Sequence, residues 1–195
     1  MLDPWVNYVS AAILLSGSVI YTIDTLRGKA KPNRVSWLLW GLAPMLALAA
    51  QISNGIGTEA LVTFAIGFGP LMVLAASFIN RSAYWQISRF DLACGALSLL
   101  ALVLWAITGQ GLVALVLSIA ADFAAALPTV AKAYEHPETE SAGGFWPAIP
   151  AGILTLLTID TWAFNNYAVV AYILIINLVI ATLISWPRLR FGARG

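Results

Sequence analysis

An acidic residue, Asp122, lies in the middle of the apolar segment SIAADFAAAL. An ionised aspartate near the centre of a membrane helix costs at least about 2.5 kcal/mol by insertion scales, so its side chain must face protein or water, or be protonated. One hypothesis is that Asp122 takes up and releases a proton as water reaches it from alternate sides. The other is that it stays neutral and hydrogen-bonds to a neighbouring helix, and the residue types alone leave both open.

Other polar side chains share a helix face with Asp122. Ser118 precedes it by four residues and Thr129 follows it by seven, which is the spacing of one α-helix face. A corresponding stripe near the N-terminus contains Tyr21 and Asp24. Two such stripes facing each other would form the walls of a central pathway, so Tyr21 and Ser118 are predicted substrate contacts. Asp24 is a second candidate for proton coupling.

The chain as a whole has the composition of a membrane protein. Of its 195 residues, 61% are hydrophobic and 10% are charged, and the mean hydropathy is +0.86. Soluble domains carry roughly a quarter charged residues. The balance of 10 Lys and Arg against 9 Asp and Glu provides no basic field for nucleic acid. We therefore expect a lipid bilayer around the chain and no nucleic-acid partner.

The remaining reactive residues argue against an enzyme. The chain has one cysteine, Cys94, and one histidine, His136, which are too few for an internal disulfide or a protein-made zinc site. It has no His beside a Ser or Cys and no Gly-rich phosphate loop. We expect no catalytic residues, no bound metal and no cofactor.

Hydropathy predicts an all-α membrane protein with seven transmembrane helices, each of which needs about 20 mostly apolar residues. No segment alternates with the period of two that a membrane barrel requires. The first helix lacks a preceding basic region and a following cleavage pattern, so we expect it to be retained rather than removed as a signal peptide. The predicted spans are 5–25, 36–53, 58–79, 90–107, 111–131, 145–163 and 166–186.

The positive charges predict how the helices cross the membrane. All ten Lys and Arg residues fall after odd-numbered helices or in the C-terminal tail: Arg27, Lys29, Lys31, Arg34, Arg81, Arg89, Lys132, Arg188, Arg190 and Arg194. The positive-inside rule places these segments and the C-terminus in the cytoplasm and the N-terminus outside. We expect the chain in the inner (plasma) membrane of a bacterium.

Several residues have an interfacial or solvated interpretation. Asp24 lies near the first basic segment, where its alternative role is an ion pair with Arg27 or Arg34. Asp91 is typical of a helix start. Three glutamates are expected in a solvated loop: Glu135, Glu138 and Glu140. The eight Trp residues lie at or near predicted helix ends, which is typical of interfacial anchors.

Residues 127–141 repeat the pattern of residues 22–36 without a gap. The matched positions, 105 residues apart, are Lys132 with Arg27, Pro137 with Pro32, and Ser141 with Ser36. A repeat of about a hundred residues predicts two parallel three-helix units joined by a fourth helix, in a 3+1+3 order. The predicted units are a first bundle over 1–80, a linker helix over 81–110, a second bundle over 111–187 and a basic tail over 188–195.

Pro128 and Lys132 form a Pro-x-x-x-Lys motif at the end of the fifth helix. Together with the 3+1+3 order, this motif resembles the PQ-loop superfamily, in particular the SWEET and SemiSWEET sugar transporters. The resemblance implies a carrier that moves a small polar solute, in the first place a sugar, by alternating access between two repeats. The alternatives are a carrier of the same fold for amino acids, vitamins or nucleosides, or a non-transporting receptor or membrane subunit. The oligomeric state stays open, a homo-oligomer included.

The resemblance also assigns roles to residues. It implies hinges at three prolines, Pro44, Pro128 and Pro150, although proline is in any case common in membrane helices. It implies a substrate site built from Trp162 and Asn177, with Asn54 as the counterpart in the first half. An indole covers the apolar face of a sugar ring, and a carboxamide binds its hydroxyls. The alternative for Asn177 is a hydrogen bond between helices.

Overall fold

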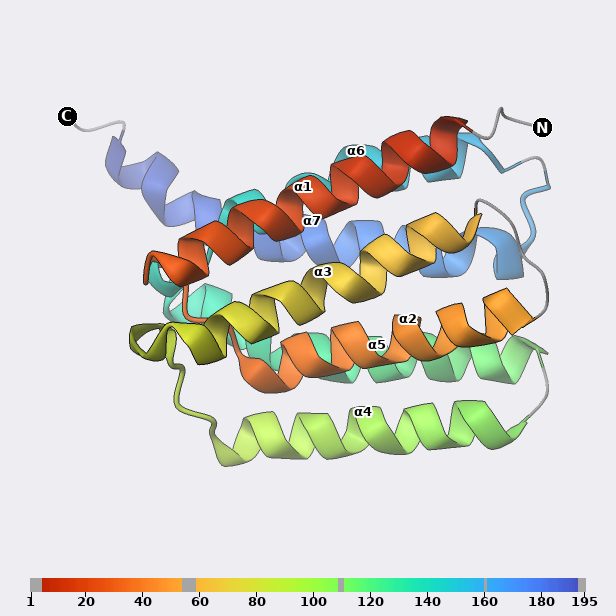
Figure 1. The fold of residues 1–195 in the computed structure, drawn as a ribbon, viewed down its shortest axis with the longest axis horizontal. Helices are drawn as coiled ribbons and strands as arrows, with labels where there is room; N and C mark the ends of the chain where they lie inside the picture. The colour runs from red at the N-terminus through yellow and green to blue at the C-terminus, as the bar shows by residue number, and fades with distance from the viewer. Residues whose placement is uncertain (1–4, 54–58, 109–110, 160, 193–195) are drawn as a thin grey trace.

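The computed structural model describes residues 5–53, 59–108, 111–159 and 161–192, and every regular element in these ranges is helical. The α-helices alternate in direction along the bundle (Figure 1). In chain order the elements are α1 (Trp5–Leu26), α2 (Arg34–Ser53), α3 (Glu59–Ile79), η1 (Arg81–Ala83), α4 (Arg89–Thr108), α5 (Gly111–Glu135), η2 (Pro137–Thr139), η3 (Ala142–Gly144), α6 (Ala148–Leu157) and α7 (Phe164–Gly192).

The predicted membrane character is confirmed by the length and surface of these helices. By length and composition, five of them are long and apolar enough to cross a bilayer: α1, α3, α4, α5 and α7. Two shorter apolar stretches are Arg34–Ala49 and Ala142–Leu157. Large apolar side chains face outward, as Leu97, Leu100 and Val103 do on α4, because lipid rather than water surrounds them. The fold is that of an α-helical integral membrane protein.

For the description of helix contacts, we call α1–α3 the first group and α5–α7 the second group. In the first group, α3 lies between α1 and α2 and contacts both (Figure 1). In the second, α7 contacts both α5 and α6. The groups meet where α1 contacts α6 and where α2 contacts α5, and α4 packs against α5 and α2. The loops that carry residues 27–33, 80–88 and 136–147 lie at one end of this bundle, on the left in Figure 1. We call this end the basic end and the opposite one the far end.

The sixth predicted helix, 145–163, is wrong at both ends. The structure has the short helix η3, a turn, and then α6 over Ala148–Leu157. Pro147 occupies the N-cap of α6 and Pro150 lies in its first turn. Proline disfavours helical backbone in the residue before it, and it has no N–H to donate to a preceding turn. The helix therefore starts beside these prolines, and Pro150 does not interrupt it.

Two other helices run further than predicted. Helix α5 continues to Glu135 rather than 131, and α7 continues to Gly192 rather than 186. Residues 188–192 of the predicted basic tail are thus helical. Hydropathy finds where a helix leaves the apolar layer, whereas helical hydrogen bonding continues into the polar layer beyond it.

The start of α4 is a reciprocal cap. The Ser88 backbone N–H donates to Asp91 Oδ2 at 2.7 Å, and the Asp91 N–H donates to Ser88 Oγ at 3.1 Å. This pattern satisfies two of the N–H groups that a helix start leaves without partners. The expected helix start at Asp91 is confirmed.

Replacing Asp91 by alanine is expected to destabilise the protein by about 1 kcal/mol, because one of the two capping bonds is lost. Thermal unfolding in detergent should show a melting temperature lower by about 2 to 4 °C. Asp91→Asn keeps an acceptor oxygen and should stay closer to the wild type. Equal melting temperatures for the alanine variant and the wild type would show that the cap contributes nothing.

Candidate functional site

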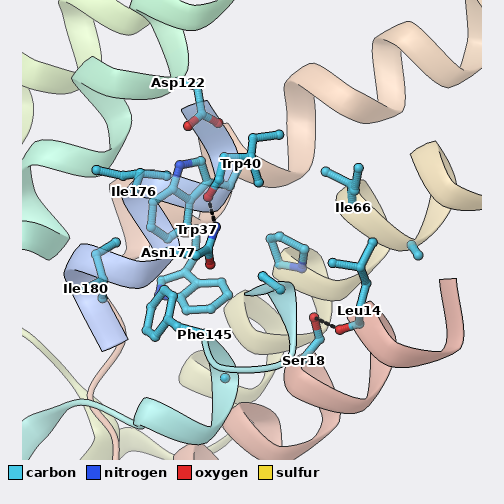
Figure 2. A pocket seen from close by; sticks show the side chains of 15 residues that line it. Leu14, Ser18, Trp37, Trp40, Ile66, Asp122, Phe145, Ile176, Asn177 and Ile180 are labelled. Carbon is cyan, nitrogen blue, oxygen red and sulfur yellow. Dashed lines mark hydrogen bonds between the residues drawn. The ribbon is translucent and has the colours of Figure 1, made fainter. Parts of the chain in front are cut away.

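A cavity of about 120 Å³ lies among the helices of both groups (Figure 2). Its wall is mostly apolar, and Ile66, Ile176 and Ile180 are part of it. Its polar and aromatic lining residues are Ser18, Trp37, Trp40, Asp122, Phe145 and Asn177. We call it the central cavity. Since α1, α2, α3, α5, α6 and α7 all contribute residues, any movement of one group against the other would change its shape.

A second cavity, of about 240 Å³, lies towards the far end. Its lining includes Gln51, Thr63 and Trp105, which lie near the far ends of α2, α3 and α4. The central cavity instead reaches Trp37 and Gly144 near the basic end. We call the second one the far cavity. The two share four lining residues: Trp40, Ile66, Asp122 and Ile173.

Asp122 therefore lies in the partition between the two cavities. The Tyr172 hydroxyl donates to Asp122 Oδ2 at 2.6 Å. The Trp40 side chain lies next to this carboxyl group (Figure 2). Among the described residues that line either cavity there is no Lys, Arg or His. The carboxyl group thus accepts from a neutral hydroxyl and has no positive side chain in the described cavity walls.

The structure separates the two residues of the predicted substrate site. Asn177 lines the central cavity, where its Nδ2 donates to the Ile173 carbonyl of its own helix at 2.8 Å. Trp162 lies in the turn between α6 and α7, is 64% exposed and packs on Tyr167 with ring centroids 5.8 Å apart. It lines neither cavity. The prediction that Trp162 lies late in the sixth helix fails because α6 ends at Leu157.

The other predicted contacts are distributed over the molecule. Ser118 lines the far cavity, and its hydroxyl donates to the Leu115 carbonyl at 2.8 Å. Tyr21 is fully buried and lines neither cavity. Asn54 lies outside the described residues. Of the predicted hinges, Pro44 is inside α2 beside the far cavity, and Pro128 is buried inside α5.

The basic end contains a polar cluster, most of it buried, that the sequence did not suggest. Lys132 Nζ lies 2.7 Å from Glu140 Oε1, and the two side chains are 1% and 0% exposed. The Tyr21 hydroxyl donates to the other oxygen of Glu140, and Ser141 Oγ donates to Asp24 Oδ2 at 2.7 Å. We call these five residues the end cluster. It links α1 of the first group to α5 and the following loop of the second.

The end cluster corrects two sequence interpretations. Glu140 is buried and paired rather than solvated. Asp24 accepts from Ser141 rather than pairing with Arg27 or Arg34. The Arg34 guanidinium instead donates to Ser77, at 3.1 Å to its hydroxyl and 2.5 Å to its carbonyl oxygen.

The aromatic residues between the end cluster and the central cavity were also missed. Trp37 is 5% exposed, so it is not an interfacial anchor. Its ring centroid lies 4.5 Å from that of Tyr21, 5.4 Å from Trp40 and 6.1 Å from Phe145. The spacing of Trp37 and Trp40, three residues apart near a helix start, was the available signal, since it places both indoles on one helix face.

No known protein family, curated protein or solved structure matches the chain. The class of the protein therefore rests on its own features, which are those of an α-helical membrane protein with two internal cavities that share one carboxyl group.

Replacing Tyr172 by phenylalanine is expected to destabilise the protein by about 1 kcal/mol, because Asp122 loses its hydroxyl donor in a partly buried setting. Thermal unfolding in detergent measures the change, with Tyr134→Phe as the control because Tyr134 is 75% exposed. In a double-mutant cycle with Asp122→Asn, the two changes should not be additive. Additive changes would mean that the hydroxyl and the carboxyl group do not stabilise each other.

Proposed function

We propose that the protein is an alternating-access carrier for a small polar solute. The observation that carries this proposal is the position of Asp122, in the partition between two cavities that extend towards opposite ends of the bundle. A solute or proton bound there needs only a small rearrangement to pass from one cavity to the other. Carriers with repeated units commonly place their site near the midplane, between the units.

The packing of the helices supports a 3+1+3 repeat. If α1–α3 correspond to α5–α7, the contact of α1 with α6 corresponds to that of α5 with α2, and both contacts are present. The third helix of each group packs against the other two. Helix α4 packs against α5 and α2, outside this correspondence. Two such groups can rotate about a shared axis while each keeps its own packing.

The repeat of residues 22–36 in 127–141 fits the same relation. It pairs Asp24 with Thr129 and Ser36 with Ser141 at a spacing of 105 residues. Ser141 of the second group donates to Asp24 of the first. The corresponding residues on the other side, Ser36 and Thr129, are both fully buried. The two halves thus contribute equivalent positions to the interior of the basic end.

The end cluster supports a state that is closed at the basic end. It joins Tyr21 and Asp24 of the first group to Lys132, Glu140 and Ser141 of the second. A solute in the central cavity could leave through the basic end only after these bonds break. In this proposal Asp24 belongs to the closure, and Asp122 is the carboxyl group that carries a proton when transport is proton-coupled.

The test is flux in proteoliposomes, with and without a proton gradient. The panel starts with sugars, which the resemblance suggests, and includes amino acids, nucleosides and amines. A carrier should give saturable uptake and counterflow of at least one solute. Binding without net flux for every solute that binds would contradict the carrier proposal and indicate a receptor.

A crosslink tests the closure at the basic end. In a Cys94→Ser background, cysteines at positions 24 and 141 replace side chains whose oxygens lie 2.7 Å apart. Oxidation should stop the flux, and reduction should restore it. Each single-cysteine variant is the control. Full flux in the oxidised double variant would show that the basic end does not open during transport.

A further inference from the structure

We infer that the solute bound at the partition is a small organic cation, held by the Asp122 carboxylate and an aromatic wall made of Trp37, Trp40 and Phe145. This inference rests on the proposed carrier function and narrows the class of its solute. It departs from the sugar that the resemblance suggests, and the departure comes from the charge and the polar groups of the cavity wall.

The first argument is charge. Within the described lining of both cavities, Asp122 and Tyr172 are the only side chains of the types Asp, Glu, His, Lys, Arg, Cys and Tyr, so Asp122 is the one carboxyl group there. The Tyr172 hydroxyl donates a hydrogen bond to the carboxyl group but brings no positive charge. A buried carboxylate is expensive unless a cation or a proton accompanies it. The site is therefore complete only with a bound proton or a bound cation.

The second argument is the shape of the aromatic wall. Trp40 lies nearly perpendicular to Trp37, at an interplanar angle of 83° and a centroid distance of 5.4 Å. Phe145 lies at 76° to Trp40, with centroids 6.4 Å apart. Figure 2 shows Trp40 next to the carboxyl group of Asp122, whereas Trp37 and Phe145 line the same cavity farther from that group. Rings that meet at steep angles present faces in several directions, which is how aromatic cages bind ammonium groups.

The third argument is the small number of polar groups available to a sugar. The Ser18 hydroxyl donates to the Leu14 carbonyl at 3.5 Å, and Asn177 Nδ2 donates to the Ile173 carbonyl at 2.8 Å. One donor of each group is thus used within its own helix, as the dashed lines in Figure 2 show. A sugar brings several hydroxyls, and each one buried without a partner opposes binding. An alkylated ammonium group has no hydroxyls, so it needs no such hydrogen-bond partners in the cavity wall.

Because the site has a single carboxylate, we expect the protein to exchange protons for cations across the membrane. One negative charge is neutralised either by one proton or by one monovalent cation, so the two compete for Asp122. A proton released to one side and a cation taken up from that side keep the charge of the site balanced. Transport would then be a one-for-one antiport, with the proton gradient driving the cation.

Binding by the purified protein in detergent tests the inference. The probes are choline and tetramethylammonium, compared with 3,3-dimethylbutan-1-ol, an uncharged analogue of choline, and with glucose. Isothermal titration calorimetry should show choline binding tighter than its neutral analogue by roughly tenfold or more, since charge and cation–π attraction act only on the cation. This comparison needs only the wild-type protein, so it does not depend on how any variant folds.

Two variants test whether the negative charge of Asp122 is responsible for choline binding. Asp122→Asn keeps the size and much of the hydrogen bonding of the side chain but removes its charge, so choline affinity should fall by roughly tenfold or more. Asp91→Asn is the matched control, because it changes a buried aspartate that lines neither cavity. Its choline affinity should stay within roughly twofold of the wild type, which is well below the effect of losing the cavity charge.

The outcomes separate the inference from the proposed function. Equal binding of choline and its neutral analogue, wild-type choline binding by Asp122→Asn, or no binding of either cation at millimolar concentration would overturn the cation site. Flux of glucose in proteoliposomes without flux of choline would also overturn it, while leaving the carrier proposal intact. Cation binding that depends on Asp122 but is never accompanied by flux would support the site and contradict the carrier.

Discussion

Replacing Lys132 by methionine is expected to lower the free energy of unfolding by about 3 to 5 kcal/mol, the usual cost of leaving one member of a buried ion pair without the other. Lys132 and Glu140 are 2.7 Å apart and almost wholly inaccessible to solvent. The ammonium group also donates to the carbonyl oxygens of Lys31 and Thr139. Methionine fills a similar volume but satisfies none of these acceptors. Thermal unfolding in detergent should show a drop of roughly 6 to 20 °C.

The double variant Lys132→Met, Glu140→Gln separates the lost pair from lost packing. It removes the uncompensated charge, so it should recover part of the stability that the single variant loses. Lys29→Met is the control, because Lys29 is an exposed lysine in the neighbouring loop. A double variant no more stable than the single one would mean that the charge pair contributes little. Because Tyr21 of the first group donates to Glu140, and Lys132 donates to the Lys31 carbonyl, the single variant should also admit polar reagents more readily at the basic end.

Long apolar helices were predictable from the sequence because a bilayer imposes a minimum length. The helix at α4 was found within one residue at each end, and its start at Asp91 was expected from the charge pattern. The sixth helix was misjudged because hydropathy treats Pro147 and Pro150 as ordinary apolar residues, whereas their missing N–H groups decide where the helix can begin. Composition thus predicts which segments lie in the membrane better than it predicts where the helix within each segment begins and ends.

The site was predictable only where a residue contradicts its surroundings. Asp122 was identified because an acidic residue in an apolar membrane helix is energetically costly unless it faces protein or water. The structure places it in the lining of both cavities. Tyr172 was missed because a tyrosine in an apolar run looks like another hydrophobic residue. Glu140 looked solvated within PETES, since its pairing with Lys132, eight positions earlier, depends on the reversal of the chain at η2. Such pairings come from tertiary structure, which local composition does not contain.

The contact of α1 with η3, where the two helix groups meet, depends on a glycine in each segment. A methyl group added at Gly17 would lie 2.8 Å from the carbonyl oxygen of Gly144 and 3.2 Å from Pro147 Cγ. The nearer atom belongs to the backbone, so it cannot move aside by a change of rotamer. Gly17→Ala should therefore push η3 away from α1 and loosen the closure at the basic end.

Gly111→Ala is the matched control for this substitution, because a methyl group there meets no atom within 4 Å. Alanine gains up to about 1 kcal/mol of helix propensity over glycine in a helix interior, and less at a helix end. Overpacking at Gly17 costs about 1 to 3 kcal/mol before that gain is counted.

We expect Gly17→Ala to have a lower melting temperature than Gly111→Ala and to carry less flux. Gly143→Ala should lie between them, since the one close contact of its methyl group would be with a side-chain atom, Ile20 Cγ2 at 2.7 Å, and its next contacts are at 3.8 Å. Equal stability and flux for Gly17→Ala and Gly111→Ala would show that the two groups do not need close contact here, and the closure would then depend on the polar bonds of the end cluster alone.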